Sequence, residues 1–512
     1  MRNMKLKYIA LAALLAGATA CEKTVEPKVY SYLTGDNAFI TLSDAKAAVN
    51  GVYSRLKQPS GRSDAWMYYA GFQVTISDLT TDIGHASSGG DVGLMSECQW
   101  APANTYLAFA WQHQYKLVTD ANIALYHIPK MTALTDDQKT QFTAELRFLR
   151  ALGYVDLTDA FGPVILVTEE TVAKNESSPD YTASIAPSPV ADVNKLIISD
   201  LEYAAAHLPV NYVSNPIYST NDIGRASKGA ALALLCKLYM REHEYQKALD
   251  LTTQVMTLGY DLYPSYSGLF AEKNKWCQES IFYALADPLT DAVEIMNHFG
   301  PLNNPQVTDR WQYFAVTWYF WNTFSDQDDR KQMFYYDYIG TDGLHYMQSP
   351  DGSTKPPTGY YYMPDVATKK FADPNGSTTY YDGHVFPILR YADILLSRAE
   401  MINELSGPTA EAINLINRVK GRSHAPLLGD ATTFTKDALR DAILQERGWE
   451  FFFECKRRQD LIRMGKYETV VNKYLKTVNL TQTISMPRDK YFSYPQAQVD
   501  MNHSLNNGDR RN

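Results

Sequence analysis

The chain has 512 residues, 45% of them hydrophobic, and a formal net charge of −9 at pH 7. This length and composition are those of a globular protein with a large core, and they allow two to four domains. Because the chain is acidic and has no cluster of lysine and arginine, we expect no nucleic-acid partner.

The first 20 residues predict a bacterial lipoprotein signal peptide. Three basic residues come first, and an uncharged run over residues 8–20 follows, which is too short to span a bilayer comfortably. The run ends in LLAGATAC, which is similar to a relaxed lipoprotein cleavage box. We therefore expect export, lipidation of Cys21 and anchoring through its acyl chains. An ordinary signal peptide that is cleaved after Ala20 is the alternative.

Four helical patterns follow a short polar tether over residues 21–36. Apolar residues at helical spacing predict helices that begin at Ser43, extend over 107–131, run from Thr135 to Gly162, and run from Ser188 to Pro209. The third helix is the best delimited, because Thr135 and Gln138 form a capping box and Gly162 precedes a proline.

The clearest helix pair lies between Gly224 and Leu258. Apolar residues repeat at helical spacing on both sides of a polar turn at 241–244, which predicts two antiparallel helices. The pair resembles a tetratricopeptide repeat, with Ala248 as its small packing residue and Thr252 in place of the usual aromatic residue. One such hairpin cannot bury its own apolar face, so the sequence predicts an α-solenoid of stacked pairs.

The character of the chain changes after Leu258. Residues 259–385 are rich in Gly, Pro, Asn, Asp and aromatic residues, which predicts a functional loop region or a small subdomain with minor strands at 280–286 and 378–381. Helical patterns return at Phe386 and end with a long helix over 436–464. On that helix Glu446, Glu450, Glu454 and Arg458 stand four residues apart, which favours an ion-pair ladder over a catalytic site.

These patterns define a mainly α protein with a tetratricopeptide-like helical-pair scaffold and a large irregular, loop-rich subdomain. The predicted divisions are a lipoprotein signal peptide at 1–20, a flexible tether at 21–36, an N-terminal helical scaffold at 37–258, an aromatic-rich irregular subdomain at 259–385, and a C-terminal helical scaffold and tail at 386–512.

Several blocks of the sequence resemble the SusD/RagB family of outer-membrane nutrient-binding lipoproteins from Bacteroidota. These blocks include LSDAKAAVNGVYSRL, TAELRFLRALGYVDLTDAFGPVILV, GRASKGAALALLCKLYM and AILQERGWEFFFECKRRQDLIRMGKY. The resemblance extends over essentially the whole mature chain. The closing segment departs from the family pattern, because His503 stands where proline is usual and the final PGY is missing.

The resemblance implies a function beyond what periodicity indicates. Such proteins bind without cutting, and they sit as a hinged lid on a SusC-like TonB-dependent transporter. The resemblance therefore implies a surface-exposed lipoprotein of the cell outer membrane, anchored at Cys21, that captures a glycan and passes it to the transporter. A peptide ligand is the alternative within the family.

A glycan binder needs exposed aromatic rings to stack on sugar C–H faces and a few planar polar groups to orient the hydroxyls. The chain has 36 Tyr and 8 Trp. Half of each aromatic cluster is expected to lie in the core. The candidate ligand-binding residues are Trp311, Trp318 and Trp321 within WQYFAVTWYFW, a second group of Trp66, Tyr69 and Trp100, and Asp78 as a polar partner.

A catalytic activity and a metal site also stay open at this stage. An extracellular glycoside hydrolase would need two carboxylates roughly 5 to 9 Å apart in an aromatic cleft. Acidic loop residues near Asp78 and near Asp328 could bind structural calcium, although their spacing matches no EF-hand. No nucleophile elbow, HExxH or phosphate loop is present. Because the family resemblance implies binding without cutting, we expect no enzyme activity, and no cofactor other than structural calcium.

Overall fold

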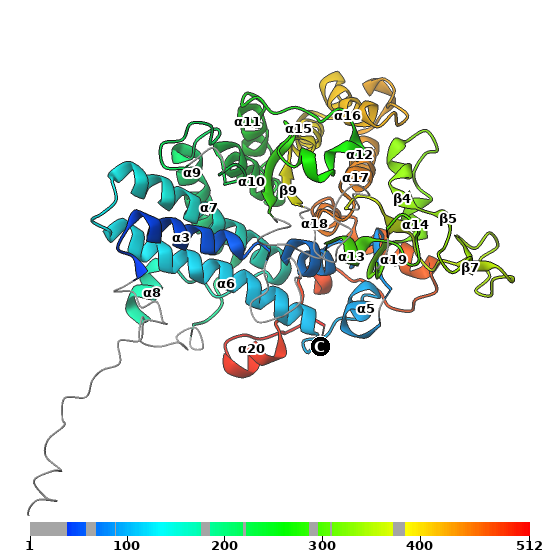
Figure 1. Ribbon diagram of the computed structural model, residues 1–512, viewed down its shortest axis with the longest axis horizontal. Helices are drawn as coiled ribbons and strands as arrows, with labels where there is room; N and C mark the ends of the chain where they lie inside the picture. Colours follow the sequence, from blue (N-terminus) through cyan, green and yellow to red (C-terminus); the bar gives the residue numbers. More distant parts are fainter. Residues whose placement is uncertain are drawn as a thin grey trace, which may run out of the picture.

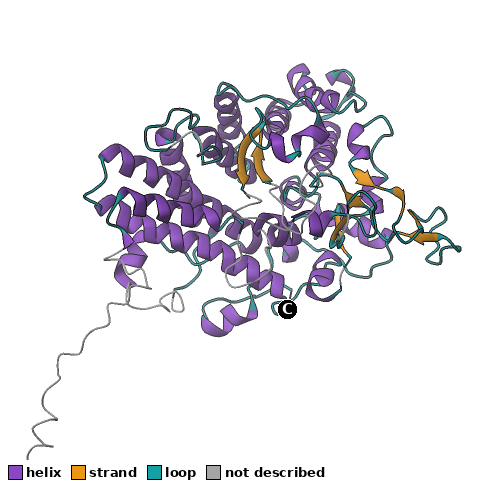
Figure 2. Cartoon of the chain, viewed as in Figure 1, coloured by secondary structure: helices purple, strands orange, loops and turns teal. Residues whose placement is uncertain are grey.

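The computed structural model describes residues 38–57, 68–87, 89–175, 185–218, 222–285, 295–307, 310–371 and 385–511. The predicted signal peptide and tether, with Cys21, lie outside the described residues, as does Trp66. Helices dominate the chain, and apart from one central pair the short strands gather at one side (Figure 2). The mainly α fold class is confirmed, whereas the predicted division into five segments stays a prediction.

Helices of the N-terminal half stack side by side (Figure 1). They are α3 (Leu42–Ser54), α6 (Thr105–His127), α7 (Asp136–Phe161), α9 (Val190–His207), α10 (Lys228–Arg241) and α11 (Tyr245–Met256). Helix α6 packs on α7, α7 on α9, α9 on α10 and α10 on α11, so each helix covers the apolar face of the one before it. The expected stack of helical pairs is therefore present.

Small residues let α10 and α11 approach closely. Ala248 is fully buried, and the Cys236 thiol donates a hydrogen bond to its carbonyl oxygen at 3.5 Å. Thr252 takes the place of the aromatic residue that is usual in a tetratricopeptide repeat. Its buried hydroxyl donates to the Leu249 carbonyl oxygen at 2.6 Å. The same hydroxyl accepts from the Arg398 guanidinium of the C-terminal part at 3.3 Å, so both its donor and its acceptor roles are used.

Local capping fixes the helix starts. The capping box at α7 is confirmed, because the Thr135 hydroxyl accepts from the Gln138 amide and the Gln138 side chain accepts from the Thr135 amide. For α3 the predicted start at Ser43 is wrong, because the N-cap residue is Thr41. The Asp44 carboxylate accepts from the Thr41 amide at 2.7 Å, and this reciprocal box starts the helix earlier.

Short helices and strands make up the irregular region and its surroundings. The short helices are α4 (Val74–Ile76), α5 (Gly90–Ser96), α8 (Glu169–Asn175), α12 (Tyr266–Leu269), α13 (Ile295–Phe299) and α14 (Trp318–Trp321). The strands are β1 (Gly84–Ala86), β2 (Ser280–Ala284), β3 (Phe314–Val316), β4 (Phe334–Tyr335), β5 (Asp337–Ile339), β6 (His345–Met347), β7 (Tyr360–Tyr362), β8 (Ala367–Thr368) and β9 (Phe386–Arg390).

These strands form small separate sheets. Strands β1 and β3, β2 and β9, and β4 and β8 pair antiparallel, and β6 lies between β5 and β7. The predicted strand at 280–286 is confirmed as β2, and the predicted strand at 378–381 lies outside the described residues. The β5–β6–β7 sheet projects from the body at the right of Figure 1.

The C-terminal part continues the helical stack. It contains α15 (Tyr391–Ser406), α16 (Ala410–Arg422), α17 (Lys436–Phe451), α18 (Arg457–Arg463), α19 (Tyr467–Thr477) and α20 (Gln496–Met501). Helix α15 packs against α11, so the stack crosses from one half of the chain to the other. The predicted helix start at Phe386 is wrong, because 386–390 is a fully buried strand paired with β2. A short continuous apolar run does not distinguish a buried strand from a buried helix.

The long helix predicted over 436–464 is also wrong, because it breaks after Phe451 and restarts at Arg457. Phe453 and Cys455 adopt positive φ angles of 55° and 60° in the break. The buried Lys370 ammonium accounts for this break, because it donates to the Phe452 carbonyl oxygen at 2.7 Å, where a continuing helix would supply its own donor.

The glutamates of α17 anchor a buried charge network. Arg390 lies 2.7 Å from Glu279, 2.5 Å from Glu450 and 2.7 Å from Glu454. Arg330 contacts Glu446 at 2.7 Å and Glu450 at 3.0 Å. The further members are Asp328, Lys370, Lys420 and Arg422, which come from other segments.

The expectation that these glutamates lock the helix to neighbouring segments is confirmed. Arg458 was wrongly included, because it donates to the Asp489 carbonyl oxygen. Burial acts to raise the pKa of Glu450, but the charges of Arg422, Arg390 and Arg330 outweigh it and hold that pKa well below its usual range. The network therefore ties α17 to neighbouring segments, with Glu450 held in its ionised form.

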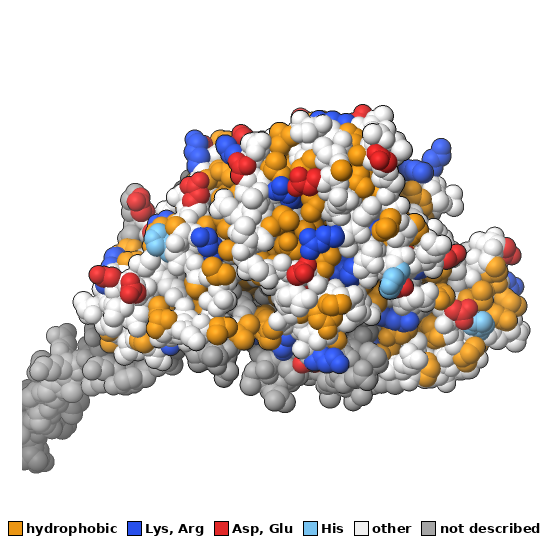
Figure 3. Space-filling view, turned by 90° about the horizontal axis from the view of Figure 1, so that it is seen from above, with side chains coloured by type: hydrophobic (Ala, Val, Ile, Leu, Met, Phe, Trp, Pro, Cys, Tyr) orange, Lys and Arg blue, Asp and Glu red, His pale blue; other side chains and the backbone are white. Residues whose placement is uncertain are grey.

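The surface carries both charge signs. On the face drawn in Figure 3, basic and acidic side chains are interspersed with apolar ones, without a continuous basic stretch. Within the residues that the structure describes, no helix has the length and apolar character needed to cross a membrane.

Candidate functional site

Trp311 is the most exposed of the predicted ligand-binding residues that the structure describes. It lies just before β3, and 44% of its surface is exposed. Its amide donates to the Asn297 carbonyl oxygen at 2.9 Å, and the next amide, of Gln312, donates to the Gly300 carbonyl oxygen at 2.9 Å. The His298 ring stands edge-on to the indole with centroids 5.4 Å apart. The loop is therefore fixed at its backbone, and the indole points outward from a rigid base.

A hydrogen-bonded group of polar side chains supports this loop. The Gln312 side-chain amide donates to the Asp365 carbonyl oxygen at 3.0 Å, and the Ser87 hydroxyl donates to the Gln312 carbonyl oxygen. His85 Nδ1 lies 2.6 Å from an Asp365 carboxylate oxygen. Burial acts to lower the pKa of His85, but the hydrogen bond and charge of Asp365 outweigh it and raise that pKa. These groups join β1, β3 and the segment before β8 into one platform.

A second aromatic group follows β3, on α14. Trp318 and Trp321 are half-buried and stand edge to face with ring centroids 5.3 Å apart. The Trp318 indole N–H donates to the Met363 carbonyl oxygen at 2.8 Å. Tyr336 packs against Trp321 at 5.3 Å, and the Lys331 ammonium lies 4.5 Å from the centre of the Trp321 ring. This Trp318 corner holds three rings in fixed orientations with part of each exposed.

Close packing under β3 fixes the position of both aromatic groups. Phe314, Ala315 and Val316 are fully buried, and Gly84 on β1 pairs with Val316. A Cβ at Gly84 would lie 2.9 Å from a Phe453 ring atom, so only glycine lets the strand pair sit on this ring. Trp311 therefore lies just before the buried strand β3, and Trp318 lies just after it.

Tyr69, Trp100 and Asp78 were predicted to bind the ligand, but the structure places all three in the core. Tyr69 is 3% exposed, and its hydroxyl donates to Asp156 at 2.8 Å. Trp100 is 2% exposed and packs edge-on against Phe492 with centroids 5.0 Å apart. Neither ring presents a face to solvent, because large apolar rings that are surrounded by packed segments stabilise the core.

Asp78 is also buried, with no measurable exposure. Its carboxylate accepts from the backbone amides of Cys455 at 2.9 Å and Arg457 at 3.3 Å, and burial raises its pKa to about 7. Asp78 therefore fixes the backbone in the break between α17 and α18. It does not reach a ligand surface.

The acidic loop residues considered for calcium have other partners. Asp82 forms a bidentate pair with Arg457 at 2.9 Å for both oxygens, and Asp328 pairs with Arg330 at 2.8 Å. Among the described residues, no group of three or more His, Cys, Asp or Glu side chains is arranged to hold a metal ion.

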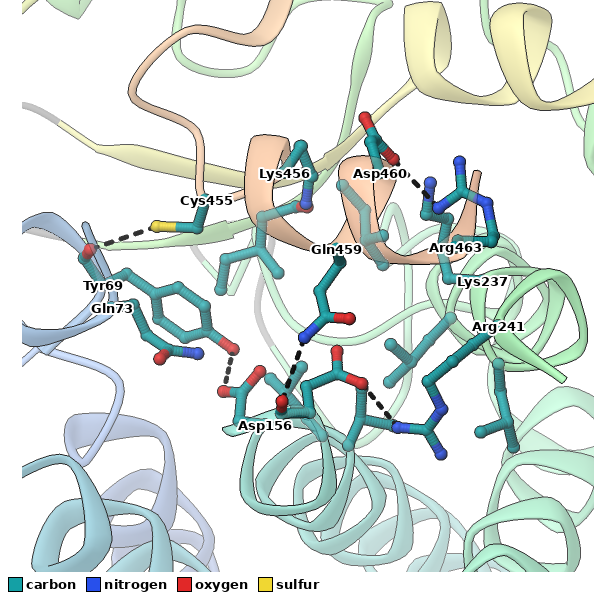
Figure 4. A pocket seen from close by; sticks show the side chains of 17 residues that line it. Tyr69, Gln73, Asp156, Lys237, Arg241, Cys455, Lys456, Gln459, Asp460 and Arg463 are labelled. Atoms are coloured by element: carbon teal, nitrogen blue, oxygen red, sulfur yellow. Dashed lines mark hydrogen bonds and ion pairs between the residues drawn. The ribbon is translucent and has the colours of Figure 1, made fainter. Parts of the chain in front are cut away.

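A polar cavity lies between α7, α10 and α18 (Figure 4). Its volume is about 100 Å³. In Figure 4, Tyr69 points at Asp156. Gln459 donates from α18 to the Asp159 carbonyl oxygen at 3.0 Å. Ligand pockets measure about 300–1,000 Å³, so this cavity is too small for an oligosaccharide.

Several residues of the candidate site were not predicted. His298, Asp365 and Tyr106 are brought to the Trp311 loop from segments far apart in the chain, and the Tyr106 hydroxyl bonds to that of Tyr313 at 2.8 Å. No local pattern marks them. On the projecting sheet, Tyr338, Tyr346 and Tyr361 stack across the strands.

Two family models match the chain. The model described as the SusD family matches residues 293–507, and the one described as starch-binding associating with outer membrane matches residues 36–240. The chain belongs to the SusD/RagB family. Among curated SusD relatives, a SusD-like protein of Formosa agariphila is 26% identical over 90% of this chain and 90% of its own. The starch-binding protein SusD of Bacteroides thetaiotaomicron is 22% identical over 81% and 80%.

Solved SusD structures share the fold. A SusD homolog from Bacteroides thetaiotaomicron has a TM-score of 0.75 at 23% identity and covers 92% of this chain and 97% of its own. A surface glycan-binding protein A from the same organism, solved with laminarihexaose, has a TM-score of 0.70 at 21% identity over 90% and 97%. This agreement confirms the fold that the sequence resemblance implied.

Proposed function

We propose that the protein is a cell-surface glycan-binding lipoprotein that captures an oligosaccharide or polysaccharide at Trp311. The observation that carries this proposal is the half-exposed indole on a backbone-anchored loop. An indole face stacks on the C–H face of a sugar, and a fixed loop loses little freedom when the sugar binds. The half-exposed rings of the Trp318 corner would extend the contact to further sugar units.

The family supports the same ligand class. Relatives carry names that state starch binding and laminarin binding. Within this proposal the protein is lipidated at Cys21, faces outward from the outer membrane, and delivers its glycan to a SusC-like TonB-dependent transporter. It acts by binding alone, as the family resemblance implies.

A panel of polysaccharides tests the proposal. The mature protein is run by affinity electrophoresis in gels that contain laminarin, starch, xyloglucan or pectin, and retardation in at least one gel is expected. The same mixtures are assayed for new reducing ends, which are expected to be absent. New reducing ends would identify a glycoside hydrolase instead.

A peptide receptor is the second candidate within the family. Titration with a casein hydrolysate in place of glycans tests it. Heat released by the hydrolysate, together with no retardation in any polysaccharide gel, would replace the glycan proposal by the peptide one.

A further inference from the structure

A further tryptophan, which the site described above does not use, is exposed elsewhere on the protein. Trp276 lies in the loop before β2, and 41% of its surface is exposed. Its indole rests on Gly224, where an added Cβ would lie 2.3 Å from the ring atom Cη2. Gly224 also has a φ of 104°, which favours glycine. The ring is therefore seated on the backbone of another segment.

The indole borders a groove made of two adjoining hollows. One has a volume of about 150 Å³ and is lined by Val210, Asn211, Tyr260 and Trp276 among others. The second, of about 280 Å³, reaches to the end of α3. Both are lined by Tyr283 and by residues 223–225, so they share a wall.

A polar group that a ligand can reach in this wall is the exposed amide of Asn211, which is planar and can both donate and accept. Tyr283, in contrast, is 5% exposed, and its hydroxyl interacts with the Ser280 side chain. Its ring therefore closes the wall of the groove.

The charges beside the groove are already neutralised. Arg225 pairs with Glu145 at 3.0 Å and with Asp222 at 3.1 Å. The groove therefore offers an indole, apolar side chains and an amide, and its cation is engaged. This combination matches a neutral sugar, which presents an apolar C–H face and several hydroxyls.

We propose that the Trp276 groove is a second saccharide-binding site, which takes a neutral sugar unit with its C–H face on Trp276 and a hydroxyl on the side-chain amide of Asn211. This inference rests on the proposed glycan-binding function and adds a site to it. A polysaccharide long enough to reach both sites would be retained more strongly than a short fragment, because its second contact is intramolecular.

Fluorine NMR of the mature protein labelled with 5-fluorotryptophan tests the inference site by site. The Trp276 and Trp311 resonances are assigned by their loss in Trp276→Phe and Trp311→Phe. The titrants are laminarihexaose, maltohexaose and hexasaccharides of the best-retained polysaccharide of the panel. The Trp276 resonance is expected to shift saturably, and to do so also in Trp311→Ala. In Asn211→Ala the half-saturating concentration is expected to rise about three- to tenfold.

The outcomes separate the two proposals. A shift of the Trp311 resonance with a stationary Trp276 resonance overturns the second site and leaves the proposed function intact. Two stationary resonances, with no retardation in any gel, overturn both. A Trp276 resonance that responds to casein hydrolysate and to no sugar also overturns the inference, because the groove would then hold peptide.

Discussion

The buried network around α17 and the aromatic surface around Trp311 use dense clusters of residues in opposite ways. In the network, each glutamate meets arginine or lysine from other segments, and the side chains are almost fully buried. At the aromatic surface, the backbone is fixed while the indoles keep exposed faces. Groups that are fully satisfied inside the protein stabilise the fold, whereas groups with an exposed face remain available to a ligand.

The largest effect should come from breaking the buried network. In Arg390→Ala, Glu450 and Glu454 lose a buried partner, so the free energy of unfolding should fall by about 3–5 kcal/mol. The midpoint of guanidinium unfolding measures this loss. The matched control is Lys195→Ala, since Lys195 pairs with Asp192 on the exposed face of α9. An equal shift in both variants would contradict the contrast between buried and exposed charges.

A buried carboxyl outside the network should make stability depend on pH. Burial raises the pKa of Asp156 to about 7, although the Tyr69 and Tyr68 hydroxyls bond to it. Its unfolded value is about 3.9, so the folded state holds a proton between about pH 4 and 7 that the unfolded state releases. The contribution of this group to stability therefore falls as pH rises through that window.

The variant Asp156→Asn removes this proton while it keeps an acceptor for the tyrosines. The difference in free energy of unfolding between pH 5 and pH 8 should change by on the order of 2 kcal/mol relative to the unmodified protein. Urea unfolding at the two pH values measures it. Other titrating groups are common to both proteins, so an unchanged difference would show that Asp156 is ionised throughout.

Removing the exposed indole should affect binding without affecting the fold. Trp311→Ala is expected to weaken binding of the retained polysaccharide by about tenfold, ~1.4 kcal/mol, because a stacking anchor is lost. Isothermal titration calorimetry measures the affinity, and Trp311→Phe should recover part of it. The control is Leu427→Ala, an exposed apolar residue of the C-terminal part. Equal affinity in Trp311→Ala and the control would place the ligand elsewhere.

The smallest effect should distinguish the two indoles of the Trp318 corner. Trp318→Phe loses the hydrogen bond to the Met363 carbonyl oxygen, which should cost about 1 kcal/mol of stability. The Trp321 indole N–H has no partner within the described residues, so Trp321→Phe should cost less. Thermal unfolding of the two variants compares them, and an equal loss would mean that the Trp318 bond contributes nothing.

Much of the scaffold could be predicted from local patterns. The α10 and α11 pair follows from apolar spacing and small residues, and the start of α7 follows from Thr135 and Gln138. The boundaries that failed involve partners distant in sequence. Residues 386–390 form a strand because β2 pairs with them, and α17 ends early because Lys370 bonds a carbonyl oxygen in the break.

The candidate site was predicted only in part. Trp311, Trp318 and Trp321 retain exposed surface, whereas Tyr69, Trp100 and Asp78 are core residues. An aromatic cluster in a sequence does not show which ring faces solvent, because that depends on the segments that cover it. No sequence pattern singles out Trp276 as a binding residue. Its importance follows only from its contact with Gly224 in the folded protein.

The sequence by itself determined the helical pairs, the family and the stretch from which the exposed indoles come, because helix periodicity, caps and motifs are local properties of the chain. Only the tertiary structure decided which aromatic rings are buried and which partners each charge has. Both depend on contacts between segments hundreds of residues apart, such as Asp78 with Cys455 and Arg330 with Glu450.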